Sequence, residues 1–218
     1  MRILIVGSAA SRGRALLTRS IGGDDCIAQG IERGHTLRVL TREPRHFAVA
    51  PTVECCAVDM AEPAAMARAL VDQEAVIIAM GARPTWRALT SMSLSVRRVV
   101  AAMIEARVER LLCVTGVGVG DSRGHGGYWF DRIVQPLLLR QIVADQEAAE
   151  TVVRASSLRW TIVRPALLTN GSMTARYRIL TELQHIVAAT IARRDVVHFL
   201  FDELERNEFV GKSPLLTY

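Results

Sequence analysis

The sequence predicts a protein of the α/β class, built around a doubly wound parallel sheet. Short aliphatic runs alternate with stretches of helical pattern along most of the chain. The first run ends at a glycine-rich loop, as the first strand of such sheets often does. The 218 residues, half of them hydrophobic, suffice for one core. We therefore expect a single domain over residues 1–218, in which about 166–218 form a small lobe on the substrate side.

Six aliphatic runs have the composition of strands that are buried on both faces. They are Arg2–Val6, Thr36–Thr41, Val53–Val58, Ala75–Ala79, Arg110–Thr115 and Trp160–Arg164. Helical patterns cover Pro63–Val71, about 86–107, about 128–156 and Arg193–Arg206. Gly34 marks the end of the first helical region, and Pro63 marks the start of the next. The alternation predicts right-handed crossovers between parallel strands.

Composition and charge argue against several classes of protein. No apolar run approaches the roughly 20 residues that cross a bilayer. The 27 basic residues, all arginine except Lys212, are scattered rather than gathered into a nucleic-acid-binding run. The four cysteines have no metal-ligand spacing, which indicates packed, reduced thiols. We expect a cytoplasmic monomer or homodimer that binds a small-molecule substrate and no nucleic acid, membrane or metal. The acidic cluster Glu203–Glu208 is typical of a solvated helix face.

The loop after the first strand has the small residues that a phosphate-binding turn needs. It reads Gly7-Ser8-Ala9-Ala10-Ser11-Arg12-Gly13, a G-x-x-G-x-x-G frame in which Ala10 replaces the middle glycine. Small residues there let backbone amides approach a pyrophosphate at a helix N-terminus. The candidate cofactor-binding residues are therefore Gly7, Ser8, Ala10, Arg12 and Gly13. The alternative is a plain turn without a ligand.

The chain between this loop and the second strand is longer than the pattern requires. Gly34 lies 27 residues after Gly7, about ten more than one loop and helix need. Residues 21–25, Ile-Gly-Gly-Asp-Asp, interrupt the helical pattern, and Asp24 has the character of a helix cap. Either the loop carries an insertion or the first helix is split.

The residues at the end of the second strand favour a cofactor with a 2′-phosphate on its ribose. An acidic residue at this position accepts hydrogen bonds from the ribose hydroxyls of NAD. This sequence instead has Thr41 and Arg42, with Arg45 nearby. Guanidinium groups suit the 2′-phosphate of NADP, so we expect NADP(H) as the cofactor. The alternative is a solvated arginine on a surface loop.

Several motifs, taken in order, resemble those of the atypical short-chain dehydrogenase/reductase group. They are Val58-Asp59, Ala79-Met80-Gly81, Thr115-Gly116, the run Trp-Thr-Ile-Val-Arg-Pro at 160–165, and Ile191–Val197. Within this group the sequence is similar to the NAD(P)H-binding, NmrA-like and biliverdin-reductase-B or flavin-reductase-like proteins. The resemblance covers nearly the whole chain and implies a Rossmann-type fold with an NAD(P) cofactor. The altered glycine loop and the extra residues after it depart from the family pattern.

The resemblance also implies roles for residues that follow the predicted strands. Asp59, Met80 and Gly81 would flank the adenosine half of the cofactor, and Thr115 would lie beside the nicotinamide. Pro165 and Leu167 would hold the carboxamide. The alternatives are that Asp59 only caps a helix and that Pro165 only ends a strand.

The Tyr-x-x-x-Lys pair that many short-chain dehydrogenases use is absent from the sequence. No tyrosine has a lysine four residues later, and Ile142 and Gln146 occupy the aligned positions. The candidate catalytic residues are Thr115, His125 and Tyr128, with Arg132 as a possible electrostatic partner of the tyrosine. Alternatively, Tyr128 is a packing or substrate-contact aromatic and His125 is a surface histidine.

These features favour an NADPH-dependent reductase that transfers hydride to a conjugated or carbonyl-bearing small molecule. A flavin, a quinone or a polyketide-like compound is expected, from the resemblance alone. Val117–Phe130 and Leu167–Ile179 would form the substrate pocket. Because the Tyr-Lys pair is missing, a non-catalytic NAD(P) sensor of the NmrA-like type is a second interpretation. An isomerase or epimerase that retains its cofactor is a third.

Overall fold

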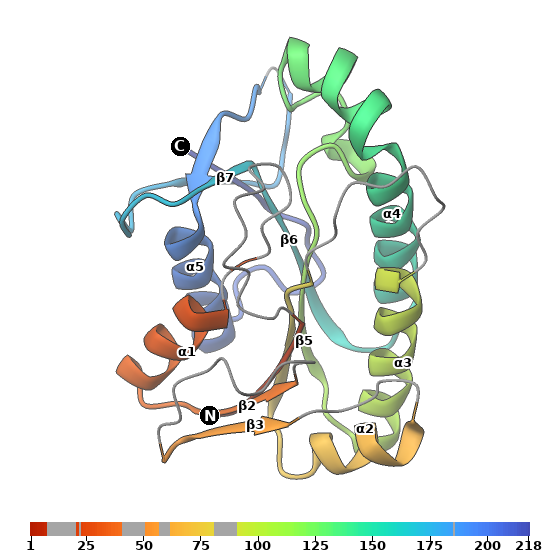
Figure 1. The fold of residues 1–218 in the computed structure, drawn as a ribbon, viewed down its shortest axis with the longest axis vertical. Coiled ribbons are helices and arrows are strands. Elements are labelled where there is room, and N and C mark those ends of the chain that lie inside the picture. Colours follow the sequence, from red (N-terminus) through yellow and green to blue (C-terminus); the bar gives the residue numbers. More distant parts are fainter. Residues whose placement is uncertain (8–20, 22, 41–50, 57–61, 81–90, 185) are drawn as a thin grey trace.

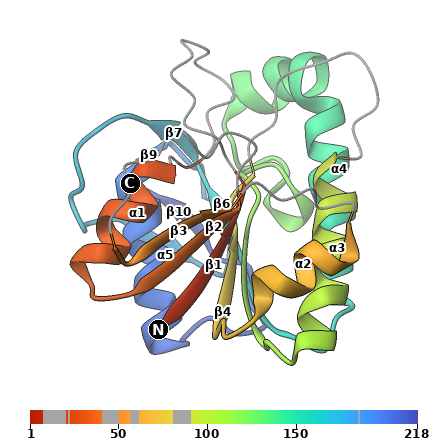
Figure 2. The same ribbon diagram turned by 60° about the horizontal axis from the view of Figure 1, so that its bottom comes forward.

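The computed structural model describes residues 1–7, 21, 23–40, 51–56, 62–80, 91–184 and 186–218. These residues form an eight-stranded sheet in the order β3-β2-β1-β4-β5-β6-β10-β8 (Figures 1 and 2). Only β8 within this described sheet runs antiparallel to its neighbour, β10. The strands are β1 Arg2–Val6, β2 Thr36–Leu40, β3 Val53–Cys56, β4 Ala75–Ile78, β5 Arg110–Val114, β6 Arg159–Pro165, β8 Arg178–Leu180 and β10 Leu215–Thr217.

Helices cover both faces of this sheet. The helices α1 Gly23–Glu32 and α5 Arg193–Arg206 lie on one face, and α2 Pro63–Leu70, α3 Ser91–Ala106 and α4 Arg140–Arg154 lie on the other (Figure 1). Successive side chains of β1 alternate between the two layers: Ile3 and Ile5 join the core under α1 and α5, whereas Leu4 and Val6 join the core under α2, α3 and α4. Both faces of the strand are therefore buried, which explains its unbroken apolar sequence.

The predicted fold class, a doubly wound α/β protein, is confirmed. All six predicted strands are present where the structure describes them, and α5 has the predicted bounds. Gly34, with φ +73°, follows α1 as expected, and Pro63 is the first residue of α2. These positions agree because local backbone preferences and hydrophobic periodicity point to the same structure there.

Two helical regions differ from the simple expectation. The predicted helix at about 128–156 consists of a π-type segment, η3 Phe130–Leu139, followed by α4. Pro136 lies inside η3 and has no N–H to continue an α-helical ladder, which accounts for the change in winding. Helix α1 begins at Gly23, with Asp24 and Asp25 in its first turn. Residues 8–20, which would decide between an insertion in the loop and a split first helix, lie outside the described residues.

The residues after Pro165 complete the main sheet and also form a second, smaller sheet. Strand β10 pairs in parallel with β6, and β8 then pairs with β10. A second, two-stranded parallel sheet joins β7 Leu167–Thr169 to β9 Thr190–Ala192. Phe199 and Phe201 of α5 are fully buried in the core.

Within the described ranges, no helix has the length and apolar character needed to cross a membrane.

Glu203 corrects one expectation about the surface. Its side chain does not lie on a solvated helix face but is only 2% exposed. Its carboxylate accepts a hydrogen bond from Arg110 Nη2 at 2.7 Å and from the backbone N–H of Glu208 at 3.0 Å. The prediction was wrong because the cation that holds Glu203 in the core comes from β5, which sequence neighbours cannot reveal.

Candidate active site at the carboxyl ends of the strands

The carboxyl ends of β1, β4, β5 and β6 lie side by side at one edge of the sheet. These strands are consecutive neighbours in the sheet and run in parallel. Gly7, Met80 and Thr115 follow or lie just beyond β1, β4 and β5, and Pro165 ends β6. Ligands of open α/β sheets bind at this edge. The fold thus brings four of the predicted site residues to a single edge.

Gly7 is required by the geometry at the end of β1. Its φ of +108° is a conformation that residues with a Cβ avoid. A Cβ there would lie 2.7 Å from Met80 Cγ and 3.0 Å from the carbonyl oxygen of Ala79. The backbone of Gly7 therefore lies directly against Ala79 and Met80 at the end of β4. A glycine with positive φ and no room for a Cβ is what the first position of a dinucleotide-binding loop requires, so the described part of this edge fits an NAD(P) cofactor.

Thr115 lies just after β5, buried between the sheet and α4. Its side chain donates a hydrogen bond from Oγ1 to Glu150 Oε1 at 2.8 Å. Gly116 comes next, and among the described residues beyond its chain neighbours a Cβ there would meet only Gln146 Oε1, 3.8 Å away. Val117 N–H then donates to the Pro165 carbonyl at 3.0 Å, which keeps the loop beside the end of β6. The backbone carbonyl of Pro165 is therefore already engaged within the protein.

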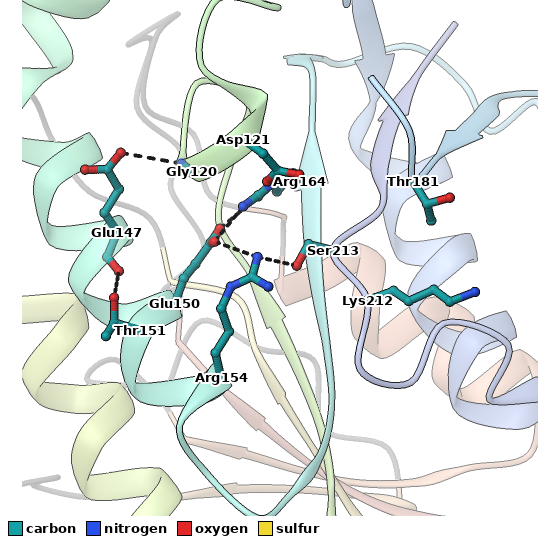
Figure 3. A pocket seen from close by; sticks show the side chains of 10 residues that line it. All are labelled: Gly120, Asp121, Glu147, Glu150, Thr151, Arg154, Arg164, Thr181, Lys212 and Ser213. Carbon is teal, nitrogen blue, oxygen red and sulfur yellow. Dashed lines mark hydrogen bonds and ion pairs between the residues drawn. The ribbon is translucent and has the colours of Figure 1, made fainter. Parts of the chain in front are cut away.

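A buried arginine, Arg164 of β6, organises the residues around Thr115. Its guanidinium donates from Nε to Glu150 Oε1 at 3.0 Å and from Nη2 to Glu150 Oε2 at 2.7 Å, and it also pairs with Asp121 (Figure 3). Gly120 lies directly over the guanidinium, because a Cβ there would approach Nη2 to 2.5 Å. The loop from Thr115 to Asp121 is thus held in place by one charged network formed by Arg164 and Glu150.

The charges in this network stabilise one another. Burial alone lowers the pKa of Arg164, but the hydrogen bonds and charges of Glu150 and Asp121 outweigh it, so the pKa of Arg164 is raised. Partial burial raises the pKa of Asp121, but the Arg164 hydrogen bond and charge outweigh that effect and the pKa is lowered. Arg164 and Asp121 therefore both stay charged at neutral pH.

The network also forms one wall of a pocket on the α4 face. The pocket has a volume of about 540 Å³. Figure 3 shows α4 on one side and the chain before β10 on the other, with Arg164 between them. Arg154 bridges the two sides, donating to Ser213 Oγ at 2.7 Å. Lys212, which was not expected at any site, lines the far wall with Thr181.

His125 joins the loop after β5 to a segment before β9. Its ring Nδ1 is 2.7 Å from the Ile186 carbonyl oxygen, and its own carbonyl accepts from Ala188 N–H at 2.7 Å. An Nδ1–H bonded to a carbonyl leaves Nε2 as the ring nitrogen that can exchange a proton. His125 thus joins the loop after β5 to residues 186–188, and only Nε2 of its ring is left for a ligand.

Tyr128 lies on the surface at the start of η3. It is 70% exposed, and its ring packs edge to face with Trp129, 72% exposed, at 5.9 Å between centroids. The Arg132 guanidinium lies 5.9 Å from the Tyr128 ring centroid. Among the described residues, no hydrogen bond or ring contact joins Thr115, His125 and Tyr128 to one another. Their catalytic roles stay predictions.

The remaining predicted residues divide into described and undescribed ones. Leu167 is the first residue of β7 and is 39% exposed. Met80 is partly buried and packs against the core under α2 and α3. The other predicted cofactor residues lie outside the described residues: Ser8, Ala10, Arg12, Gly13, Thr41, Arg42, Asp59 and Gly81.

Sequence reasoning missed Glu150 and the role of Arg164. A signal was present for Arg164, since a charged residue inside an aliphatic strand implies a buried partner. No comparable signal marked Glu150, which lies 14 residues earlier on a helix with other acidic residues. The contact depends on how α4 packs against β6.

Comparisons with known proteins agree with this architecture. The NAD(P)H-binding family model matches residues 21–207. A short-chain dehydrogenase/reductase (wide type) from Veillonella parvula, solved in complex with NADP, superposes with a TM-score of 0.80 at 18% identity, over 100% of this chain and 94% of that one. The oxidoreductase ylbE from Lactococcus lactis gives a TM-score of 0.76 at 18% identity, covering 100% and 90% of the two chains.

A third similar structure is ChuY, an anaerobillin reductase from Escherichia coli O157:H7. It gives a TM-score of 0.73 at 17% identity, over 100% of this chain and 97% of that one. At these identities the solved structures establish a shared fold. The family model covers most of the chain and includes every described strand from β2 to β9. The chain therefore belongs to the NAD(P)H-binding family.

Proposed function

We propose that the protein is an NADPH-dependent reductase whose cofactor lies along the carboxyl ends of β1, β4, β5 and β6. The observation that carries this proposal is Gly7, whose positive φ and close approach to Met80 are those expected of the first glycine of a dinucleotide-binding loop. When bound, the cofactor supplies the hydride. The protein's own residues bind it, orient it and exclude water.

The described residues support distinct tasks at this edge. Gly7 and Met80 bound the cofactor side, and Thr115 and the loop held by Arg164 bound the nicotinamide side. The proton that accompanies hydride transfer comes from water, from Nε2 of His125 or from Tyr128. The substrate is a conjugated or carbonyl-bearing small molecule, and the exposed rings of Tyr128 and Trp129 suit a flat one.

The preference for NADPH over NADH rests on Arg42, beyond the described end of β2. The proposed location is cytoplasmic, which the four free cysteines support because reducing compartments keep thiols unpaired. Burial raises the pKa of Cys26 to about 12, so this thiol stays protonated and unreactive.

Cofactor binding is tested by titrating the purified protein with NADPH and with NADH while following nicotinamide fluorescence. We expect micromolar affinity for NADPH and at least tenfold weaker binding of NADH, which is a difference in binding free energy of about 1.4 kcal/mol. The reason is that NADH lacks the 2′-phosphate that a guanidinium would bind. Arg42→Ala should remove the preference. Arg97→Ala, which removes an exposed arginine from α3, should leave the preference for NADPH unchanged. Binding of neither cofactor contradicts the proposal.

Reductase activity is tested by oxidation of NADPH in the presence of FMN, a quinone and anaerobillin. Oxidation that depends on one of these acceptors supports the reductase. Tight NADPH binding with no oxidation by any acceptor favours the non-catalytic sensor instead. Cofactor that stays bound through purification without net turnover favours the isomerase or epimerase.

A further inference from the structure

The side chain of Thr115 has its single proton committed to a buried carboxylate. Thr115 Oγ1 donates to Glu150 Oε1 at 2.8 Å, and Glu150 is only 3% exposed. The same oxygen accepts from Arg164 Nε at 3.0 Å, and the second oxygen accepts from Arg164 Nη2 at 2.7 Å. A carboxylate bonded to a guanidinium in this way is ionised and can only accept. Thr115 must therefore be the donor in its bond to Glu150.

This bond fixes what Thr115 can offer to a ligand. A hydroxyl has one proton and two lone pairs, so Thr115 retains only acceptor capacity. Donating to a substrate carbonyl instead would leave the buried Glu150 carboxylate one hydrogen bond short, which is costly. Thr115 is therefore unsuited to act as a proton donor, and its partner at the cofactor site must itself be a donor.

We propose that Glu150 is a positioning residue that presents Thr115 as a hydrogen-bond acceptor for the carboxamide NH₂ of the nicotinamide. The proposal rests on the proposed function, because it requires the cofactor at this edge. Gly116 supports it, since the described residues beyond its chain neighbours leave a Cβ there in contact with Gln146 alone, at 3.8 Å, so the backbone next to Thr115 is not crowded by them. Pro165 supports it as well, because its carbonyl is already bonded to Val117 N–H and is less available to the carboxamide.

The test compares NADPH with its reduced 3-acetylpyridine analogue, in which a methyl group replaces the NH₂. The wild-type protein should bind NADPH about five- to tenfold more tightly than the analogue, the value of one neutral hydrogen bond. Thr115→Val, which keeps the shape and removes the acceptor, should bring the ratio close to one. Thr115→Ser should restore it.

Glu150→Gln tests the positioning role through the same ratio. A glutamine can give its oxygen to Arg164 and its NH₂ to Thr115, which would turn the threonine proton toward the cofactor. The preference for NADPH should then disappear or reverse in favour of the acetyl oxygen. A purely structural role of Glu150 would weaken both ligands equally and leave the ratio unchanged. Glu147→Gln, one turn earlier on α4, is the matched control and should keep the wild-type ratio.

The outcomes separate this inference from the proposed function. If the wild-type protein binds neither compound, the proposed function fails. If it binds NADPH but the ratio stays the same in Thr115→Val, the inference is wrong while the proposed function stands. Because Thr115→Val is close to isosteric, this result does not depend on whether Glu150→Gln folds.

Discussion

Two buried arginine–glutamate pairs lie on opposite faces of the sheet, one near the amino ends of its strands and the other near their carboxyl ends. Arg110 begins β5 and meets Glu203 of α5 at 2.7 Å, whereas Arg164 near the end of β6 meets Glu150 of α4 at 2.7 Å. Glu203 gathers Arg110, Thr161 and the backbone after α5, all of them structural groups. Glu150 instead reaches Thr115 at the candidate active site.

The two arginines also differ in how well their charge is compensated. Burial lowers the pKa of Arg110, and one carboxylate, Glu203, only partly offsets it. Arg110 Nε is buried without a hydrogen-bond partner in the described part of the protein. Arg164 has two carboxylate partners, Glu150 and Asp121, and its pKa is raised. Loss of Glu203 would therefore leave the Arg110 charge without a carboxylate partner. Loss of Glu150 would leave Arg164 still paired with Asp121.

The largest effect should follow from Glu203→Gln. This change leaves the Arg110 charge buried without a carboxylate, and we expect a loss of about 3–5 kcal/mol in the free energy of unfolding. Urea unfolding followed by circular dichroism measures it. NADPH affinity of the folded protein should be unchanged, because Arg110 lies at the amino end of β5. A loss below about 1 kcal/mol would show that the two pairs do not differ as described.

A smaller loss of stability should follow from Glu150→Gln. Asp121 still faces Arg164 in this variant, so we expect a loss of about 1–2 kcal/mol, measured in the same way. Glu147→Gln provides the control, because its partner Arg123 is 64% exposed and such pairs contribute about 0–1 kcal/mol. A loss as large as that of Glu203→Gln would contradict the compensation by Asp121.

The smallest effect concerns pH. The folded-state pKa of Asp121 is lowered, chiefly because Arg164 outweighs the effect of burial. Its contribution to stability is therefore complete above the unfolded-state pKa of about 3.9 and is lost as pH falls through the lower folded-state value. Asp121→Asn should be less stable than the wild type near neutral pH, and the difference should shrink below about pH 4.

Urea titrations at several pH values measure this convergence. Asp72→Asn, in the exposed turn after α2, serves as the control for replacing a surface aspartate by asparagine. A difference between wild type and Asp121→Asn that stays constant down to pH 2 would mean that Arg164 does not hold the Asp121 charge.

The fold was largely predictable because local and global signals agree in most of the chain. Arg2–Val6 and Ala75–Ile78 are apolar on both faces, and Gly34 and Pro63 punctuate the chain where α1 ends and α2 begins. Strands β7, β8, β9 and β10 were not predicted. Each has only three residues in the structure, too few for a periodic pattern to mark.

The candidate site was predictable only where a backbone requirement dictates the residue. Gly7 was predicted because the loop pattern needs a glycine there, and the structure gives it a positive φ. Thr115 and Pro165 were predicted from the family resemblance at the ends of expected strands, and the structure places them at the carboxyl ends of β5 and β6. Glu150 and Glu203 were missed or misread, since the cation that buries each one is distant in sequence. Whether a glutamate on a helix faces water or an arginine depends on tertiary packing, and the sequence pattern records only the helix.

The central claim is that an NADPH site begins at Gly7, and a pair of glycine substitutions tests it most directly. Gly7→Ala places a Cβ 2.7 Å from Met80 Cγ, whereas a Cβ at Gly34, also at positive φ, meets none of the described residues within 4 Å. Both should cost stability of about 1 kcal/mol or more through backbone strain. Fluorescence titration should show at least a tenfold loss of NADPH affinity in Gly7→Ala and wild-type affinity in Gly34→Ala. Equal affinity in the two folded variants would contradict a cofactor site at this end of β1.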